Sequence, residues 1–299
     1  MSSQVGAFPQ VTLPIDMSNG LRMDPAEAKA LGSLFTEEYN KAEPFQHIVF
    51  DGILPDELIE RILADFPAAA RVNASNDKVF TIGYGGDHKR QIMPEDCERF
   101  SRELFLFFNS RPMLQFLEGL TGIESLLPDP YFTGGGYHEI TKGGRLGVHA
   151  DFRINPQLHV QRRLNMLIYL NPEWNDDWKG QLELWSRDMK ECKQRVSPLL
   201  NRCVVFNTEA DTWHGHPDPL DVPDGISRKS IALYYYTASR RVYEETPRRS
   251  TMYVARPGDS AQDKAEARKF RTEEYLKEWL PPVAYRGLAK VRRVLKKIA

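Results

Sequence analysis

The chain has few of the features that mark secreted, membrane-spanning or strongly charged proteins. Its three cysteines, Cys97, Cys192 and Cys203, are odd in number and far apart, so they form neither a disulfide framework nor a paired zinc motif. No apolar run approaches the roughly 20 residues that cross a bilayer, and residues 1–14 lack the charged start and apolar stretch of a signal peptide. A net charge of −1 gives no reason to expect nucleic acid. We therefore expect a soluble, cytoplasmic protein.

The pattern of elements predicts a mainly β core with helices on either side of it in the sequence. With 299 residues and 41% hydrophobic content, the chain can bury a substantial core. Residues 131–237 form short β-type runs separated by Gly, Pro, Asn and Asp, which is typical of a closed or double-sheet β architecture. Ahead of them, the spacing of apolar residues predicts helices over 24–42, 55–63, 95–109 and 113–120 and a strand over 45–50.

The segment after residue 237 changes character. Residues 247–260 are polar and predict a loop or linker, and residues 261–280 predict a helix that ends at Pro281-Pro282. Residues 285–299 carry six basic side chains and no acid, with apolar residues at helical spacing. We expect a solvated helix packed on its own domain, and contact with anionic lipid or an acidic partner is the alternative.

His149 and Asp151 stand two residues apart in a segment that reads as a strand, so their side chains share one face. Two imidazoles and one carboxylate on one face of an octahedral ion are the ligand set of non-heme Fe(II) oxygenases. His214 is the candidate second imidazole, but His216 lies on the same strand face and periodicity does not choose between them. A His-x-Asp pair also arises readily by chance as a surface feature, so the downstream context has to support it.

That context resembles the 2-oxoglutarate- and Fe(II)-dependent oxygenases, in particular their prolyl-hydroxylase-like branch. The resemblance runs from about residue 130 to 238, and the motifs occur in the family's order. They are Tyr137, Gly143-Gly144 and Leu146 before His149-Ala150-Asp151, then Arg162 to Asn171, Gly180-Gln181-Leu182, Cys203 to Phe206, Trp213-His214-Gly215, and Arg228-x-Ser230. Gln181 departs from the pattern, since a second glycine is usual there. The resemblance favours His214 over His216 and implies a double-stranded β-helix (jelly roll, cupin-like) fold.

The resemblance also implies roles for residues that would hold 2-oxoglutarate. Arg228 is the candidate for its far carboxylate, because a planar guanidinium donates two hydrogen bonds to such a group. Ser230 lies on the same strand face and can add a hydroxyl donor. Tyr169 occupies the position of a phenol that contacts this carboxylate in the branch, and Tyr137 is a further cofactor-binding candidate. For Arg228 the alternative is an ordinary salt-bridging strand residue.

The implied enzyme is a 2-oxoglutarate-dependent dioxygenase. Its cofactors would be Fe(II), 2-oxoglutarate and O2, with ascorbate as a candidate reductant, and its reaction the hydroxylation of an unactivated C–H bond. Substrate identity stays open among a prolyl peptide, a free amino acid and another small molecule, and oligomeric state is also open. The alternatives are a catalytically silent cupin-like binding module and a related desaturase or cyclase. The expected division of the chain has three parts. Residues 1–44 form an N-terminal extension, residues 45–240 form the oxygenase domain with its catalytic core at 130–238, and residues 241–299 form a C-terminal linker and helical extension.

For several further charged residues and histidines, the sequence predicts no part in the site. Arg153, Arg162 and Arg163 could present positive charge to an anionic substrate, but we expect solvated loop charges. Surface or core roles are expected for the histidines outside the matched motifs, which are His47, His88, His138 and His159.

Overall fold

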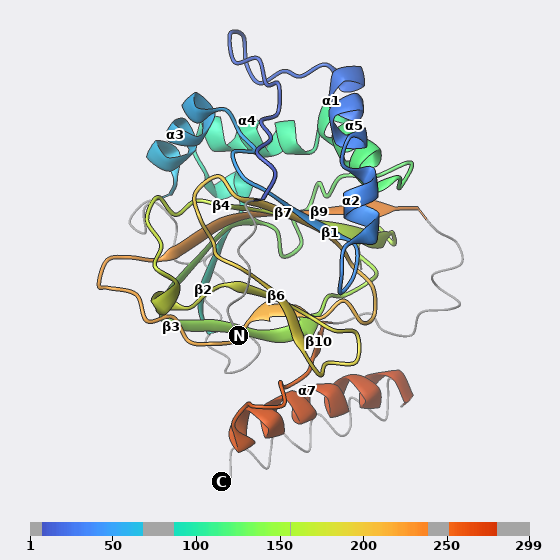
Figure 1. The fold of residues 1–299 in the computed structure, drawn as a ribbon, viewed down its shortest axis with the longest axis vertical. Helices are drawn as coiled ribbons and strands as arrows, with labels where there is room; N and C mark the ends of the chain where they lie inside the picture. The colour runs from blue at the N-terminus through green and yellow to red at the C-terminus, as the bar shows by residue number, and fades with distance from the viewer. Residues whose placement is uncertain (1–7, 68–86, 156, 239–250, 280–299) are drawn as a thin grey trace.

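Two antiparallel sheets that share one long strand make up the centre of the molecule (Figure 1). The computed structural model describes residues 8–67, 87–155, 157–238 and 251–279. The larger sheet contains, in order, β1 (His47–Phe50), β7 (Cys203–Asn207), β4 (Gln161–Tyr169), β9 (Arg228–Thr237), the first part of β3 (Gly136–Ala150) and β2 (Asp87–Ile92). The smaller sheet contains β10 (Met252–Tyr253), the second part of β3, β8 (His214–His216), β5 (Leu182–Trp185) and β6 (Cys192–Val196).

Helices cover the outer face of the larger sheet, as Figure 1 shows. They are α1 (Pro25–Ser33), α2 (Thr36–Lys41), α3 (Asp56–Asp65), α4 (Arg99–Phe108) and α5 (Arg111–Thr121). Two short 3-10 turns occur at Pro94–Asp96 and Asp176–Trp178, and α7 (Ala261–Trp279) lies at the opposite end of the molecule beside β10. The helices form where the sequence has helical spacing and caps: α1 begins after Asp24, whose carboxylate accepts hydrogen bonds from two backbone amides of the first turn.

Alternation along β9 separates the main core from the interior between the sheets. Ile231, Leu233 and Tyr235 belong to the large apolar cluster under the helices, and the Tyr235 hydroxyl donates to the carbonyl oxygen of Phe108 in α4 (2.9 Å). The residues between them project to the other face, because successive strand side chains point to opposite sides. The sheet is thus mainly apolar toward the helices and can carry polar groups on its inner face.

The structure confirms the predicted β core braced by N-terminal helices, and the double-stranded β-helix architecture. Two strands were not predicted. β2 is a polar strand that pairs with β3, and β10 lies inside residues 247–260, where we expected only a loop or linker. The predicted helix over 285–299 lies outside the described residues, and the division into three parts stays a prediction. Among the helices that the structure describes, none is long and apolar enough to cross a membrane.

Candidate metal centre and cavity

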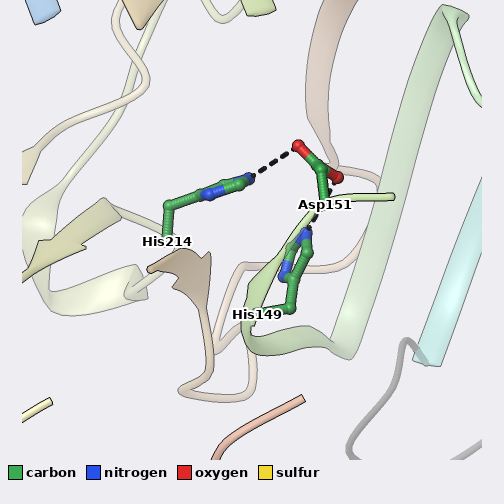
Figure 2. A group of neighbouring side chains, drawn as sticks. All are labelled: His149, Asp151 and His214. Carbon is green, nitrogen blue, oxygen red and sulfur yellow. Dashed lines mark ion pairs between the residues drawn. The ribbon is translucent and has the colours of Figure 1, made fainter. Parts of the chain in front are cut away.

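His149, Asp151 and His214 meet between the two sheets (Figure 2). Each offers one ligand atom, and the three atoms lie within 4.8 Å of one another. The Nε2 atom of His149 is 3.6 Å from Oδ1 of Asp151, and Nε2 of His214 is 3.4 Å from Oδ2. His149 ends the long strand β3 and Asp151 follows it, whereas His214 begins β8 and pairs with His149 across the sheet.

The backbone orients both imidazoles in the same way. Nδ1 of His149 lies 2.8 Å from the carbonyl oxygen of Gly147, and Nδ1 of His214 lies 3.0 Å from that of Thr212. A carbonyl only accepts, so each Nδ1 carries the proton and each Nε2 keeps a lone pair directed to the cluster. Histidine ligands of metals have this arrangement, in which a hydrogen bond at one nitrogen sets the tautomer of the other.

The position after His214 has no room for a side chain, so it is occupied by Gly215. A Cβ atom at this position would lie 2.7 Å from the carbonyl oxygen of Gly147 and 2.9 Å from that of Leu146, so any side chain would push β8 away from β3. The close approach of these strands brings His214 to His149. His216 lines the same cavity but is not a member of the three-residue cluster, which favours His214 over His216 as the sequence resemblance does.

Two neighbours hold the Asp151 carboxylate. The amide nitrogen of Asn165 donates to Oδ2 of Asp151 (2.7 Å), and Arg162 forms an ion pair with the same oxygen (3.1 Å). The Arg162 guanidinium also donates twice to the amide oxygen of Asn165, at 2.9 and 2.6 Å. Burial alone would raise the pKa of Asp151, but effects led by the charge of Arg162 outweigh it and hold the pKa well below its usual value. The carboxylate is therefore ionised and fixed in orientation.

Arg162 corrects a prediction, because it is not a solvated loop charge. Only 1% of its surface is exposed, and its guanidinium lies over the ring of Tyr234 (3.4 Å to the centroid) and near that of Phe152 (4.7 Å). Strand β4 begins at Gln161 and has an irregular register between Arg162 and Leu164 opposite β9, which local periodicity did not indicate. Arg163, its neighbour, is half-buried at an open surface depression.

A cavity of about 210 Å³ contains the cluster and reaches Arg228 and Ser230 on β9. Nε of Arg228 donates to the carbonyl oxygen of Gly180 (2.8 Å), and a terminal nitrogen donates to the Tyr169 hydroxyl (3.3 Å). Gly180 has φ +78°, and a Cβ there would lie 3.2 Å from Cδ of Arg228 and closer still to the side chain of Leu220. The glycine of the Gly180-Gln181-Leu182 motif therefore makes room for the guanidinium, which is only 4% exposed.

Tyr137 lies on the wrong side of the sheet for the predicted cofactor role. Its side chain is in the apolar cluster under the helices, its hydroxyl is 3.0 Å from that of Ser101 in α4, and its ring packs against Phe105. The adjacent residue, His138, lines the cavity instead. Since neighbouring strand residues face opposite sides, the prediction was wrong by one position.

Four further residues of the cavity wall were missed. Lys89 and Gln91 come from β2, and Thr251 and Tyr253 come from the segment containing β10. Tyr253 pairs with His149 in the sheet, and the centroids of their rings are 5.4 Å apart. No motif in the sequence indicates these contacts, because they depend on pairing between strands far apart in the chain.

The wall of the cavity is more positive than negative. Among the described residues that line it, Lys89, Arg162 and Arg228 are cationic and Asp151 is the one carboxylate. Burial lowers the pKa of Lys89 to about 8, with Asp151 opposing the shift, which leaves the amine mostly charged at neutral pH. Burial and then the charge of Lys89 lower the pKa of His138 well below its usual value, so this imidazole is neutral.

These donors fit a ferrous ion and an oxoacid. Two neutral imidazoles and one carboxylate, without a thiolate, are the facial set of non-heme iron sites and leave coordination positions for other ligands. The ionised Asp151 and the lone pairs on both Nε2 atoms supply that set. A buried guanidinium at the far side of the same cavity suits the second carboxylate of a dicarboxylic oxoacid.

Comparison with known proteins gives a family match over part of the chain and a likeness of fold. Residues 135–236 match the model of the 2OG-Fe(II) oxygenase superfamily. No curated protein sequence matches the chain. A prolyl hydroxylase from Trichoplax adhaerens, solved with a hypoxia inducible factor oxygen degradation domain peptide fragment, is 18% identical, with 71% of this chain and 91% of that chain covered and a TM-score of 0.48. A prolyl-4-hydroxylase from Pseudomonas putida is 18% identical, with 70% and 100% covered and a TM-score of 0.47.

A prolyl 4-hydroxylase from Phytophthora capsici gives the broadest of these superpositions. It is 14% identical, with 89% of this chain and 79% of that chain covered and a TM-score of 0.50. At this identity the likeness concerns the fold, and it agrees with the double-stranded β-helix described above. The family match over residues 135–236 agrees with the predicted superfamily, and the prolyl-hydroxylase-like branch stays a prediction.

Proposed function

We propose that this chain hydroxylates an unactivated C–H bond in the cavity between its two sheets, and the match of residues 135–236 to the model of the 2OG-Fe(II) oxygenase superfamily supports this proposal. One observation carries the proposal. A cluster of two imidazoles and a carboxylate shares a single cavity with a buried, cavity-facing arginine. An ion-binding or sensor module needs the cluster but has no use for a guanidinium at its far side, so this pairing favours an enzyme over a silent module.

We assign His149, Asp151 and His214 as metal ligands. Ferrous iron held by them would supply the activation of O2, coupled to conversion of 2-oxoglutarate to succinate and CO2. The protein's own part is to keep the three donors deprotonated and oriented. Hydrogen bonds to the carbonyls of Gly147 and Thr212 do this for the histidines, and Asn165 with Arg162 does it for Asp151.

We assign Arg228, Ser230 and Tyr169 to the far carboxylate of 2-oxoglutarate. Arg228 and Tyr169 contact each other directly, and the Ser230 position is paired with Tyr169 across the sheet. Burial raises the pKa of Tyr169, so its hydroxyl stays protonated and can donate. The low-dielectric surroundings strengthen an ion pair between Arg228 and a carboxylate, and the bond from Arg228 to Gly180 keeps the guanidinium from turning away.

The substrate we favour is an amino-acid-type molecule, either a prolyl group in a peptide or a small acid. The fold is shared with prolyl hydroxylases, but fold alone does not define substrate. The aromatic rings of Phe152, Tyr234 and Tyr253 line the cavity together with the metal cluster, and they would exclude water from the reacting C–H bond.

The function is tested by coupled turnover. Wild-type protein with Fe(II), ascorbate and O2 should form succinate from 2-oxoglutarate, and a true substrate should gain one oxygen atom by mass spectrometry. Asp151→Ala should abolish both readouts. A wild-type protein that binds metal and 2-oxoglutarate but forms no succinate with any substrate would support the silent module instead.

Binding of 2-oxoglutarate to Arg228 variants tests the assignment of this residue without turnover. With Mn(II) in place of Fe(II), Arg228→Met should raise the dissociation constant of 2-oxoglutarate by about 30-fold or more, because a buried charge pair loses one partner. Arg228→Lys should recover part of the affinity. Arg195→Met is the matched control, since its side chain is 61% exposed and outside the cavity lining. Equal 2-oxoglutarate affinity in the wild type and Arg228→Met would contradict the assignment.

A further inference from the structure

Two side chains of β2 continue the inner face on which Arg228 and Ser230 lie. Lys89 is paired with Ile140 of β3, which is paired in turn with Arg228 of β9. Directly opposed residues in an antiparallel sheet project to the same face, and these three all line the cavity. Gln91, His138 and Ser230 form the next such row and also line it. The amine of Lys89 therefore belongs to the cavity wall, two strands from Arg228.

Lys89 differs from the other two cations of the cavity in having no partner. Arg162 is paired with Asp151, and Arg228 donates to Gly180 and Tyr169. Among the described residues, the Lys89 amine has neither a hydrogen-bond partner nor an ion-pair partner. Lys89 is half-buried, and the main negative charge that acts on its amine is that of Asp151, which Arg162 and Asn165 already hold. The ammonium therefore has no anion of its own at the cavity wall.

A second polar group in the same cavity also lacks a partner. Nδ1 of His216 is buried and has no hydrogen-bond partner, and His216 as a whole is only 4% exposed. Buried polar groups without partners are rare in folded proteins, and the residue that carries this one also lines the cavity.

The net charge of the cavity lining indicates the sign of the charge that a ligand of the cavity carries. The four charged side chains of the lining sum to +2, from three cations and one carboxylate. A ferrous ion adds +2 and 2-oxoglutarate adds −2, so the loaded cavity keeps +2. Arg228, Ser230 and Tyr169 already provide for the far carboxylate of 2-oxoglutarate, whereas Lys89 is left without an anion.

We propose that Lys89 binds an anionic group, of carboxylate type, on the molecule that is hydroxylated, with His216 as a second polar contact. This inference rests on the proposed function and narrows its substrate class. A small acid, or a peptide that presents a carboxylate near the oxidised carbon, satisfies it. A neutral substrate leaves the Lys89 ammonium without an anion.

The test measures binding to the full chain loaded with Mn(II) and saturating 2-oxoglutarate. The probes are small acids with their matched amides, such as L-proline and L-prolinamide, and glycyl-L-proline and its C-terminal amide. Titration calorimetry and thermal melting are run on the wild type, Lys89→Met and Lys89→Arg. Lys142→Met is the control, because that side chain is 58% exposed on β3, where it pairs with Asp224.

In the wild type and the control, at least one acid should bind more tightly than its amide. Lys89→Met should raise the dissociation constant of that acid by about 30-fold or more and leave that of its amide unchanged. Lys89→Arg should retain most of the preference for the acid. Since the ammonium has no partner to lose, Lys89→Met should melt at the same temperature as the wild type or higher. A lower melting temperature, with no change in acid binding, would identify a structural cation and overturn the proposal.

Other outcomes separate this inference from the proposed function. If 2-oxoglutarate binds the wild type but no acid is preferred over its amide, the inference about Lys89 is wrong and the oxygenase assignment stands. An acid that binds only without 2-oxoglutarate competes for the metal, which also counts against Lys89. Weaker binding of 2-oxoglutarate itself to Lys89→Met would mean that Lys89 serves the cosubstrate. If 2-oxoglutarate does not bind the wild type, the proposed function itself fails.

Discussion

Removing the Asn165 amide should loosen the metal site without removing any ligand. Asn165 donates to Oδ2 of Asp151 at 2.7 Å and accepts both hydrogen bonds from Arg162. Asn165→Ala therefore deletes one of the two contacts that orient the carboxylate, and it removes the amide acceptor of the Arg162 guanidinium, which keeps its ion pair with Asp151. A hydrogen bond to a charged group contributes about 1.5–3 kcal/mol, which converts to roughly 10- to 150-fold in a dissociation constant. Loss of a group that supports a metal ligand typically costs about 10- to 100-fold.

The assay is Mn(II) binding followed by electron paramagnetic resonance or calorimetry. Asn171→Ala is a matched control, because Asn171 is equally buried at the end of β4 but donates to the carbonyls of Pro198 and Lys229, outside the cavity. We expect Asn165→Ala to bind Mn(II) at least tenfold more weakly and Asn171→Ala to bind it like the wild type, although both lose stability. A change of less than twofold in Asn165→Ala, or an equal loss in both variants, would refute the idea that Asn165 positions Asp151.

Two further predictions concern the cavity wall. Burial holds the pKa of His138 in the folded protein well below 6.5. As the pH drops below 6.5, the unfolded chain therefore binds a proton at this residue while the folded protein does not. The free energy of unfolding then falls by up to about 1.4 kcal/mol per pH unit. Urea unfolding of metal-free His138→Gln should show a flatter pH profile than the wild type, whereas His159→Gln, at an exposed position, should not. Tyr253→Ala should lose about 1–3 kcal/mol of stability and weaken Mn(II) binding, because the ring packs against His149 and Phe270. Tyr131→Ala, at a half-exposed position, should change neither, and an equal effect of both tyrosine variants would contradict a specific role for Tyr253.

The metal cluster was predictable because each part of it has a local sequence signature. His149 and Asp151 share a strand face by alternation, and the motif around His214 supplied the third member. Gly180 and Gly215 belong to the same motifs, and the structure gives their reason: both positions are too crowded for a side chain. The position of Arg228 beside Ser230 in the cavity was predictable for a similar reason, since Arg-x-Ser at the start of an apolar strand places both side chains on one face.

The errors have a common origin in the two-residue period of strands. Tyr137 and His138 are neighbours, and only the packing of helices on one face of β3 decides which of them enters the cavity. Arg162 and Arg163 pose the same problem, made harder by the irregular register opposite β9. The polar strand that carries Lys89 has no apolar alternation to reveal it, because its inner face borders a polar cavity.

The sequence by itself indicated the kinds of elements, the resemblance to the superfamily and the three groups that could bind iron, because short motifs and their order along the chain carry this information. Only the tertiary structure decided which sides of the strands became the interior, and that distant segments containing Lys89 and Tyr253 complete its wall. The physical reason is that strand pairing joins residues through backbone hydrogen bonds that are the same for every side chain. Local sequence therefore carries little information about which strand will lie beside which.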